Sequence, residues 1–278
     1  MMLRFAALCA IAEVVMSPAR AAGTQSGIQN PCGGSSALLA LVDRPTVGDS
    51  ACAVPAGQIL LEAGLARYVP EGAGGYSLGY PQLEWRFGLS TDNELVLLPP
   101  NVQHMVTPAP GGGSQVISGA SASVVGLKHE FGYNEQWLWA GEALITLPSG
   151  SPDFGSAATG YAINGIVSDS LTPVFSLTFM LGVTHLAAPA TVHAGAYYWS
   201  LNPDLVATGQ IAEHWQLYAE VYGQSHTGPG QGSGYNADGG IQYLLTPNVE
   251  LDAELGRRLS GNLGGWSHYV GVGLAILF

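Results

Sequence analysis

Basic residues are scarce in this sequence. It has 8 Lys and Arg residues against 20 Asp and Glu residues, and Lys128 is its one lysine. Proteins that bind nucleic acid carry clusters of basic side chains that contact the phosphates, and the sequence has no such cluster. We therefore expect no nucleic-acid partner. The formal net charge of -12 does not by itself assign any other partner.

Long apolar runs and catalytic motifs are also absent. Beyond residue 22, no stretch reaches the roughly 18 consecutive apolar residues that a transmembrane helix needs. There is no G-x-S-x-G turn, no H-E-x-x-H helix and no phosphate-binding Walker loop. The seven histidines are scattered, without the spacing of metal ligands. We expect a non-enzymatic protein with no catalytic residues, no cofactor and no metal site.

The first 21 residues have the composition of a secretory signal peptide. Arg4 precedes an apolar middle, Phe5–Met16, and the A-x-A triplet Ala19-Arg20-Ala21 ends the segment. The alternative is a buried N-terminal helix, although the segment is short and changes abruptly to a polar sequence. The sequence therefore predicts export, with residues 1–21 removed.

Two cysteines remain after this segment, Cys32 and Cys52, both in Gly-, Ser- and Pro-rich sequence. An exported protein meets an oxidising compartment, where paired cysteines are common. A bond between these two would close a loop of about 20 residues, worth on the order of 3 kcal/mol. We predict this disulfide; the alternative is two separate thiols.

From residue 58 onward, segments about ten residues long alternate apolar with polar residues, and turn residues separate them. A period of two places the two sets on opposite faces of a strand. Between residues 249 and 258 the second face is charged, with Glu250, Asp252 and Glu254. A soluble β-sandwich does not explain such a face, whereas an outer-membrane barrel has lipid on one face and a polar lumen on the other. We predict an all-β fold, a transmembrane antiparallel β-barrel of about twelve strands over residues 58–278.

The connections between these strands alternate in length, as in bacterial barrels with short periplasmic turns and longer external loops. Short connections are predicted at 90–93, 132–136, 168–173, 210–214 and 246–248, and long ones at 104–116, 148–159, 186–192, 225–234 and 260–266. The region 186–209 has the poorest alternation. Aromatic residues near strand ends fit rings at the lipid headgroups: Trp85, Trp137, Trp139, Tyr198, Trp199, Trp215, Tyr243 and Trp266.

Charged residues on the second face of the strands form the candidate site. They are Glu62, Glu84, Arg86, Lys128, Glu130, Glu142, Glu220, Asp238, Asp252, Glu254 and Arg258. Charges in a narrow lumen must be paired or hydrated. One interpretation is a network that braces the barrel, and the other is a polar permeation path; both can hold together. Residues 22–57 are interpreted as an N-terminal segment that lies in the periplasm or plugs the lumen.

Several segments resemble an outer-membrane transporter family, the putative MetA pathway of phenol degradation. They are residues 44–65, 82–95, 122–131, 143–150, 217–223 and 238–256. The resemblance implies a barrel in the bacterial outer membrane that passes small, often aromatic or hydrophobic compounds. It also implies that Leu274, Ile276 and Phe278 form a C-terminal signal for the barrel-assembly machinery. The matching charged positions are Glu62, Glu84, Arg86, Lys128, Glu220, Asp238 and Asp252.

Our hypothesis is a monomeric barrel surrounded by outer-membrane lipids that acts as a narrow passive channel for a small-molecule solute. Side chains and a plug can nearly fill a lumen of twelve strands. One alternative is a structural or surface-binding barrel that engages a partner through its loops. Another is a lipid-modifying enzyme, but Ser267 and His268 are adjacent in a strand and are expected to point to opposite faces.

Overall fold

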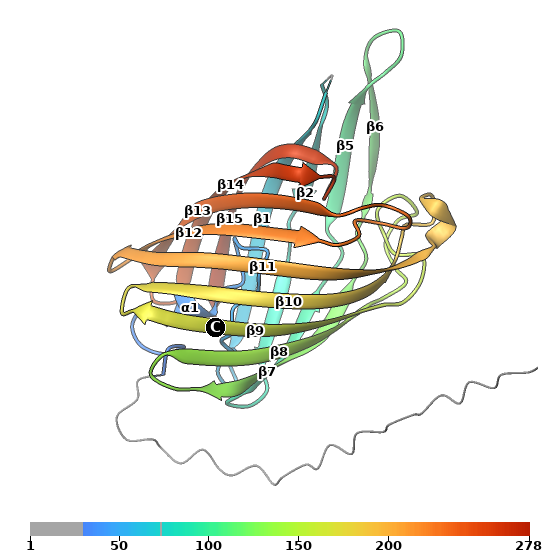
Figure 1. Cartoon of the computed structure of the whole chain (residues 1–278). Coiled ribbons are helices and arrows are strands. Elements are labelled where there is room, and N and C mark those ends of the chain that lie inside the picture. Colours follow the sequence, from blue (N-terminus) through green and yellow to red (C-terminus); the bar gives the residue numbers. More distant parts are fainter. Residues whose placement is uncertain (1–29, 73) are drawn as a thin grey trace, which may run out of the picture.

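The strands of this chain close into a barrel. The computed structural model describes residues 30–72 and 74–278, so the predicted signal peptide lies outside the described residues. The strands are β1 (Ile59–Pro70), β2 (Tyr76–Tyr80), β3 (Glu84–Gly88), β4 (Asn93–Leu98), β5 (Val102–Pro108), β6 (Ser114–Ala120), β7 (Val124–Tyr133), β8 (Trp137–Thr146), β9 (Gly160–Thr172), β10 (Phe175–Ala187), β11 (Tyr197–Ala212), β12 (Trp215–Gln224), β13 (Gly234–Thr246), β14 (Val249–Gly261) and β15 (Trp266–Leu277). All pairings are antiparallel, and β15 pairs back with β1 to close the sheet (Figure 1).

Three strands of the barrel are interrupted, which explains why fifteen segments make twelve strands. β2 and β3 both pair with β1, β5 and β4 continue one next strand, and β6 and β7 the one after. The breaks lie side by side at 81–83, 99–101 and 121–123. Pro81, Pro99 and Pro100 fall in them, and proline cannot donate a ladder hydrogen bond. The predicted all-β barrel of twelve strands is confirmed.

Only short helical elements accompany the barrel in the described residues. They are α1 (Ala37–Leu41) and the single 3-10 turn η1 (His193–Gly195). No described helix has both the length and the apolar character that a membrane span requires.

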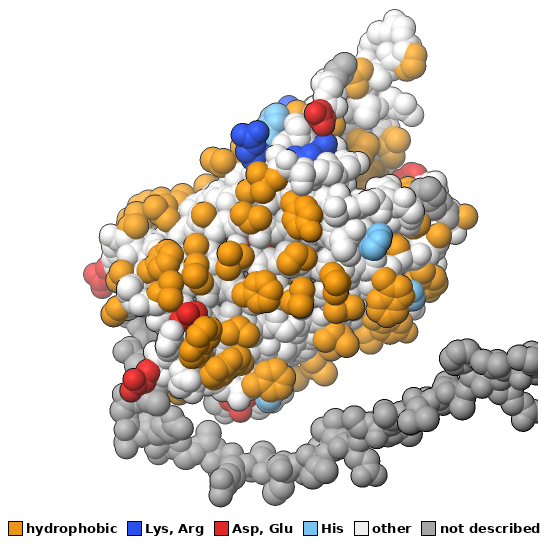
Figure 2. Space-filling model, viewed as in Figure 1, with side chains coloured by type: hydrophobic (Ala, Val, Ile, Leu, Met, Phe, Trp, Pro, Cys, Tyr) orange, Lys and Arg blue, Asp and Glu red, His pale blue; other side chains and the backbone are white. Residues whose placement is uncertain are grey.

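The outer face of the barrel is apolar, as the alternation predicts. Along β14, Leu251 and Leu255 are exposed while Asp252 and Glu254 are buried. Along β10, Phe179 and Leu181 are exposed in the same way. Figure 2 shows such apolar side chains spread over the visible wall, with few charged side chains among them. A wall of this kind suits lipid contact.

Some expected connections are wrong, for identifiable reasons. The loop expected at 104–116 is the hairpin β5–β6, which projects beyond the barrel with its turn at 109–113 (Figure 1). Its prolines and glycines are typical of a loop, yet the two strands pair with each other regularly. The turn expected at 168–173 spans only residues 173–174, and the long loop expected at 260–266 only 262–265. The poorly patterned region 186–209 contains most of β11, which has 16 residues and pairs on both sides.

Candidate functional site in the plugged lumen

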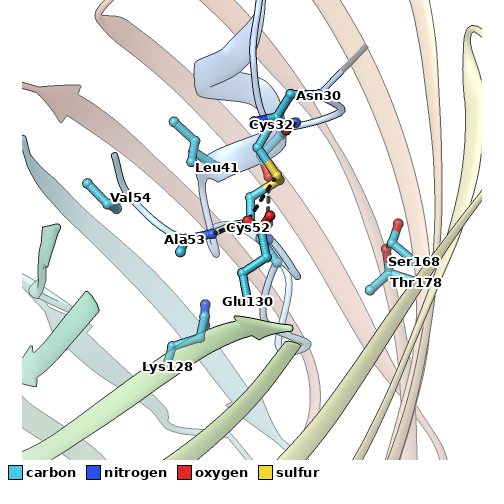
Figure 3. The surroundings of a disulfide bond; sticks show 12 residues. Asn30, Cys32, Leu41, Cys52, Ala53, Val54, Lys128, Glu130, Ser168 and Thr178 are labelled. Carbon is cyan, nitrogen blue, oxygen red and sulfur yellow. Dashed lines mark hydrogen bonds between the residues drawn. A yellow bond between two sulfur atoms is a disulfide. The ribbon is translucent and has the colours of Figure 1, made fainter. Parts of the chain in front are cut away.

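The N-terminal segment lies inside the barrel, and we call residues 30–57 the plug. Leu38 and Leu41 of α1 are fully buried, and they belong to one apolar cluster with wall residues such as Leu138, Ile166 and Leu244. These wall residues lie towards the short-turn end, near the start of β8 and the ends of β9 and β13. The predicted disulfide between Cys32 and Cys52 is confirmed, with Cα atoms 5.5 Å apart, and it joins the two ends of the plug (Figure 3).

Carboxylates of the wall hold the backbone of the plug. Four glutamates on four different strands accept hydrogen bonds from plug N–H groups. Glu62 accepts from Asp43 and Arg44 at 3.1 and 2.6 Å, Glu220 from Val47 and Gly48 at 2.7–2.9 Å, Glu94 from Val54 at 2.6 Å, and Glu130 from Ala53 at 3.3 Å. Hydrogen bonds to an ionised acceptor are stronger than neutral ones. The plug is therefore fixed between residues 43 and 54, where it has no helix or strand of its own.

Two buried cations stand at the centre of this arrangement. Arg86 is fully buried, and its guanidinium lies 2.7 Å from Glu94, 3.1 Å from Asp43 and 3.5 Å from Glu62. It also donates to the carbonyls of Leu41 and Cys52 in the plug.

Lys128 completes this cluster from β7, which is separated from the strand of Arg86 by β4. Its ammonium lies 3.0 Å from Asp43 and 3.5 Å from Glu94. A buried ion is tolerated only when it is paired in this way, so the wall cations and the plug carboxylate Asp43 depend on one another.

The plug supplies a third cation, Arg44. Its guanidinium lies 3.1 Å from Asp252 and 3.5 Å from Glu254, and it donates to the side-chain oxygen of Gln82 at 3.1 Å. Gln82 lies in the break between β2 and β3 with a φ of 46°, a conformation that is uncommon for a residue with a side chain. A Cβ on Gly64 would collide with this guanidinium, so Arg44 packs directly against the backbone of the wall at this glycine.

The predicted charged residues divide into two groups. Nine line the lumen as buried side chains: Glu62, Arg86, Lys128, Glu130, Glu142, Glu220, Asp238, Asp252 and Glu254. Glu84 is half-buried and lies directly opposite Glu62 across the β1–β3 pair. Arg258 differs, because it lies beyond the last residue of β14 that pairs with β15. It forms an ion pair with the exposed Glu71 at the rim, at 2.8 Å.

Sequence reasoning missed several residues of this site. They are Asp43, Arg44 and Asp49 in the plug, and Glu94, Asp204 and Glu250 in the wall. Glu94 and Glu250 follow the same alternation as their neighbours, which was the available signal. Trp266 and Tyr198, expected at the lipid headgroups, instead line cavities at the end with the longer loops, which we call the external end.

Asp49 is a plug residue that lies beside β8 and β9. The amide of Asn164 reaches it at 3.4 Å and reaches Glu142 at 3.0 Å. Burial raises the pKa of Asp49 well above its usual range, and the negative charge of Glu142 raises it further.

Three cavities follow the plug on the side of β9–β11. A vestibule of about 520 Å³ opens at the external end, a cavity of about 170 Å³ lies beside the plug, and one of about 440 Å³ opens at the short-turn end. The first two share Arg44, Thr46 and Asp49 as lining residues, and the last two share residues such as Ser170, Ser176 and Thr208. The cavities therefore lie end to end along one wall.

That wall is rich in hydroxyl groups. Ser176 and Thr208 lie 2.6 Å apart, and Thr178 donates to Ser168 at 3.0 Å. Figure 3 shows Ser168 and Thr178 on the wall, apart from the disulfide and from Glu130 and Lys128. Because these hydroxyls bond to one another, they do not hold the plug.

A family of known proteins shares this sequence and architecture. The model of the family described as "Putative MetA-pathway of phenol degradation" matches residues 42–275. The chain belongs to this family. No curated protein matches the sequence of this family member closely enough to count as a relative.

Solved structures share the barrel of this family member. The NanC porin matches with a TM-score of 0.50 at 13% identity, over 78% of this chain and 98% of that one. At this identity the likeness shows a common fold, that of an outer-membrane porin. The KdgM porin matches with a TM-score of 0.45 at 11% identity, over 78% of this chain and 99% of that one. The CymD monoaromatic hydrocarbon channel matches with a TM-score of 0.41 at 11% identity, over 81% and 89%.

The pair Ser267 and His268 lies differently from expectation. Their side chains do not separate to opposite faces, because Oγ of Ser267 lies 3.0 Å from Nδ1 of His268. The serine also donates to the carbonyl of Val69 at 3.0 Å. Among the described residues, no hydrogen bond or ion pair joins His268 to a carboxylate, so the third member of a triad is not in place.

Proposed function

We propose that this protein is a passive channel of the bacterial outer membrane, in which small molecules pass the plug along its hydroxyl-lined side. The observation that carries this proposal is the row of three cavities with shared lining residues along β9–β11. In this proposal the barrel is a monomer in outer-membrane lipid, inserted by the assembly machinery, and it catalyses no reaction.

The uneven attachment of the plug supports this route. Its ion pairs and most of its backbone hydrogen bonds go to the side of β1, β3, β4, β7 and β14. Towards β9–β11 the side chains in reach are mainly the hydroxyls that already pair with each other. A solute can therefore travel along this side while the plug stays bound.

The lining of the route suggests the solute class. The cavity beside the plug is narrow and lined by hydroxyls and amides such as Gln216 and Gln242, whereas aromatic rings line the vestibule. Such surfaces suit small compounds that combine a ring or apolar part with a polar group. This agrees with the aromatic compounds that the family description names.

Liposome swelling with the purified protein tests the proposal. Wild-type barrels should admit phenol-sized solutes and exclude large sugars. Thr178→Trp places a large ring in the narrow cavity and should reduce the swelling rate several-fold. Leu181→Trp, on the same strand but exposed on the lipid face, is the matched control and should change nothing. Closure of the wild-type protein to every solute would overturn the proposal, as would equal rates for the two variants.

The projecting hairpin β5–β6 favours a second candidate, a barrel that binds a surface partner. This candidate predicts that deletion of residues 109–113 abolishes the cellular phenotype while swelling rates stay unchanged. A channel predicts the reverse, with the phenotype following the Thr178→Trp variant.

A further inference from the structure

Among residues 30–72 and 74–278, no cation pairs with three carboxylates beside the vestibule. Glu220 and Asp238 lie directly opposite each other on β12 and β13, and Asp204 of β11 lies two residue pairs away from Glu220 in the β11–β12 pairing. The described cations in the lumen are engaged elsewhere, the buried Arg86 and Lys128 with Asp43 and the partly buried Arg44 with Asp252 and Glu254. Like charges directly across a strand pair destabilise a sheet, so this arrangement is costly as it stands.

Asp204 is the residue that points to a ligand. It is only 3% exposed, yet no N–H or hydroxyl group of a described residue donates to either of its carboxylate oxygens. It also lines the vestibule, above the backbone of Gly48. A buried carboxylate without donors has lost its hydration and is unfavourable unless something pairs with it.

The neighbouring donors cannot supply that pairing. The hydroxyl of Tyr269 lies 2.6 Å from Asp238 and 3.0 Å from Glu254, so its single hydrogen serves two carboxylates. Glu220 already accepts the two N–H groups of Val47 and Gly48. Within this group Asp204 contacts the side chain of Glu220, which is another carboxyl group, and no described cation pairs with it.

Aromatic rings line the same vestibule. The ring centroids of Tyr68 and Tyr269 lie 5.2 Å apart, and those of Trp266 and Tyr269 4.9 Å apart. Tyr222 stands opposite Asp204 in the β11–β12 pairing and lines the cavity beside it. Ring faces attract cations and bury apolar surface. Carboxylate and rings together recognise a cation that carries an apolar part.

We propose that the vestibule binds small organic ammonium ions, with the ammonium at Asp204 and the apolar part against Tyr222 and the Trp266–Tyr269 rings. A bare metal ion is a poorer occupant, because no group of three or more His, Cys, Asp or Glu side chains among the described residues could hold one. A cavity of about 520 Å³ also exceeds what a metal ion needs and matches an arylalkyl ammonium. This inference rests on the proposed channel function and names its substrate class.

Three matched probes test the inference by calorimetry on the full barrel in zwitterionic detergent: 2-phenylethylammonium, neutral 2-phenylethanol and anionic phenylacetate. We expect saturable binding of the ammonium, about tenfold or more tighter than that of the other two. Asp204→Asn keeps the side-chain shape and should remove this preference. Asp153→Asn, which removes a charge from an exposed external loop, should leave it unchanged. A heat-modifiability gel checks that each variant is folded.

A second measurement needs no variant. The reversal potential of wild-type channels in a KCl gradient should show that the channel conducts K⁺ in preference to Cl⁻. Equal binding of the three probes, or an Asp204→Asn variant that keeps the preference, overturns the site while the channel stands. Binding of the ammonium without swelling by any probe overturns the channel and leaves the site.

Discussion

Replacing Arg86 by methionine removes the cation on which the seating of the plug depends most. Arg86 is fully buried and joins two wall glutamates, the plug carboxylate Asp43 and two plug carbonyls. Methionine fills a similar space but leaves Glu62, Glu94 and Asp43 facing one another without it. Loss of one partner from a buried ion pair costs about 3–5 kcal/mol, because the remaining charge is uncompensated.

Hydrogen exchange of the plug amides measures this cost directly. The N–H groups of Asp43, Arg44 and Val54 are bound by Glu62 and Glu94, so they exchange only when the plug detaches. A loss of 3–5 kcal/mol corresponds to exchange faster by a factor on the order of 100 to several thousand. The barrel should remain folded, because the backbone hydrogen bonds between its strands close the sheet and do not depend on the side chain of Arg86.

Conductance in planar bilayers supplies the second readout. Arg86→Met should raise the mean conductance or its fluctuations, since a detached plug opens the charged side of the lumen. Arg258→Met is the control: its partner Glu71 is exposed, and exposed pairs contribute about 0–1 kcal/mol. If the plug amides of Arg86→Met exchange at the wild-type rate, the network does not hold the plug and the reasoning is refuted.

Three further predictions concern the same plug. Cys32→Ser with Cys52→Ser removes a loop closure worth on the order of 3 kcal/mol, so plug amides should exchange faster while the barrel keeps its heat-modifiable shift on gels. Glu220→Gln should speed exchange at Val47 and Gly48 alone, by about tenfold, because the amide is a weaker acceptor than the carboxylate; mass spectrometry of that peptide decides it. The raised pKa of Asp49 means that the seated plug favours its protonated form, so seating weakens as the pH rises through that raised value. Asp49→Asn should flatten the pH dependence of conductance, and an unchanged profile would contradict the assignment.

Much of the barrel could be predicted because lipid and lumen impose a strict alternation. The connections expected at 225–234 and 246–248 lie within one residue of the observed ones, 225–233 and 247–248. The connections expected at 186–192 and 210–214 leave a strand where β11 lies, but its observed limits, Tyr197 and Ala212, differ from the expected ones. Asn202, Pro203 and Asp204 interrupt its alternation where it borders the vestibule, so the local sequence defines this strand poorly.

The contacts of the plug could not be predicted from the sequence. Asp43 and Arg44 lie in a segment without periodicity, and their partners in the wall stand 18 to more than 200 positions away. Only the closed barrel brings Glu62, Glu94 and Asp252 into contact with the same segment, the plug. The cysteines were the exception, because an even number in an exported chain predicts a bond whatever the fold.

The inward charges raised two interpretations, a brace and a permeation path, and their positions now separate them. The paired charges lie on the side of β1, β3, β4 and β7, where they are buried against the plug. None of the three cavities is lined by these charged side chains. The cavities run instead along the hydroxyl wall of β9–β11. Paired, desolvated charges resist rearrangement, whereas hydroxyls can exchange partners with a passing solute at little cost. We therefore expect variants of the charged side to change whether the plug stays seated, and variants of the hydroxyl side to change which solutes pass.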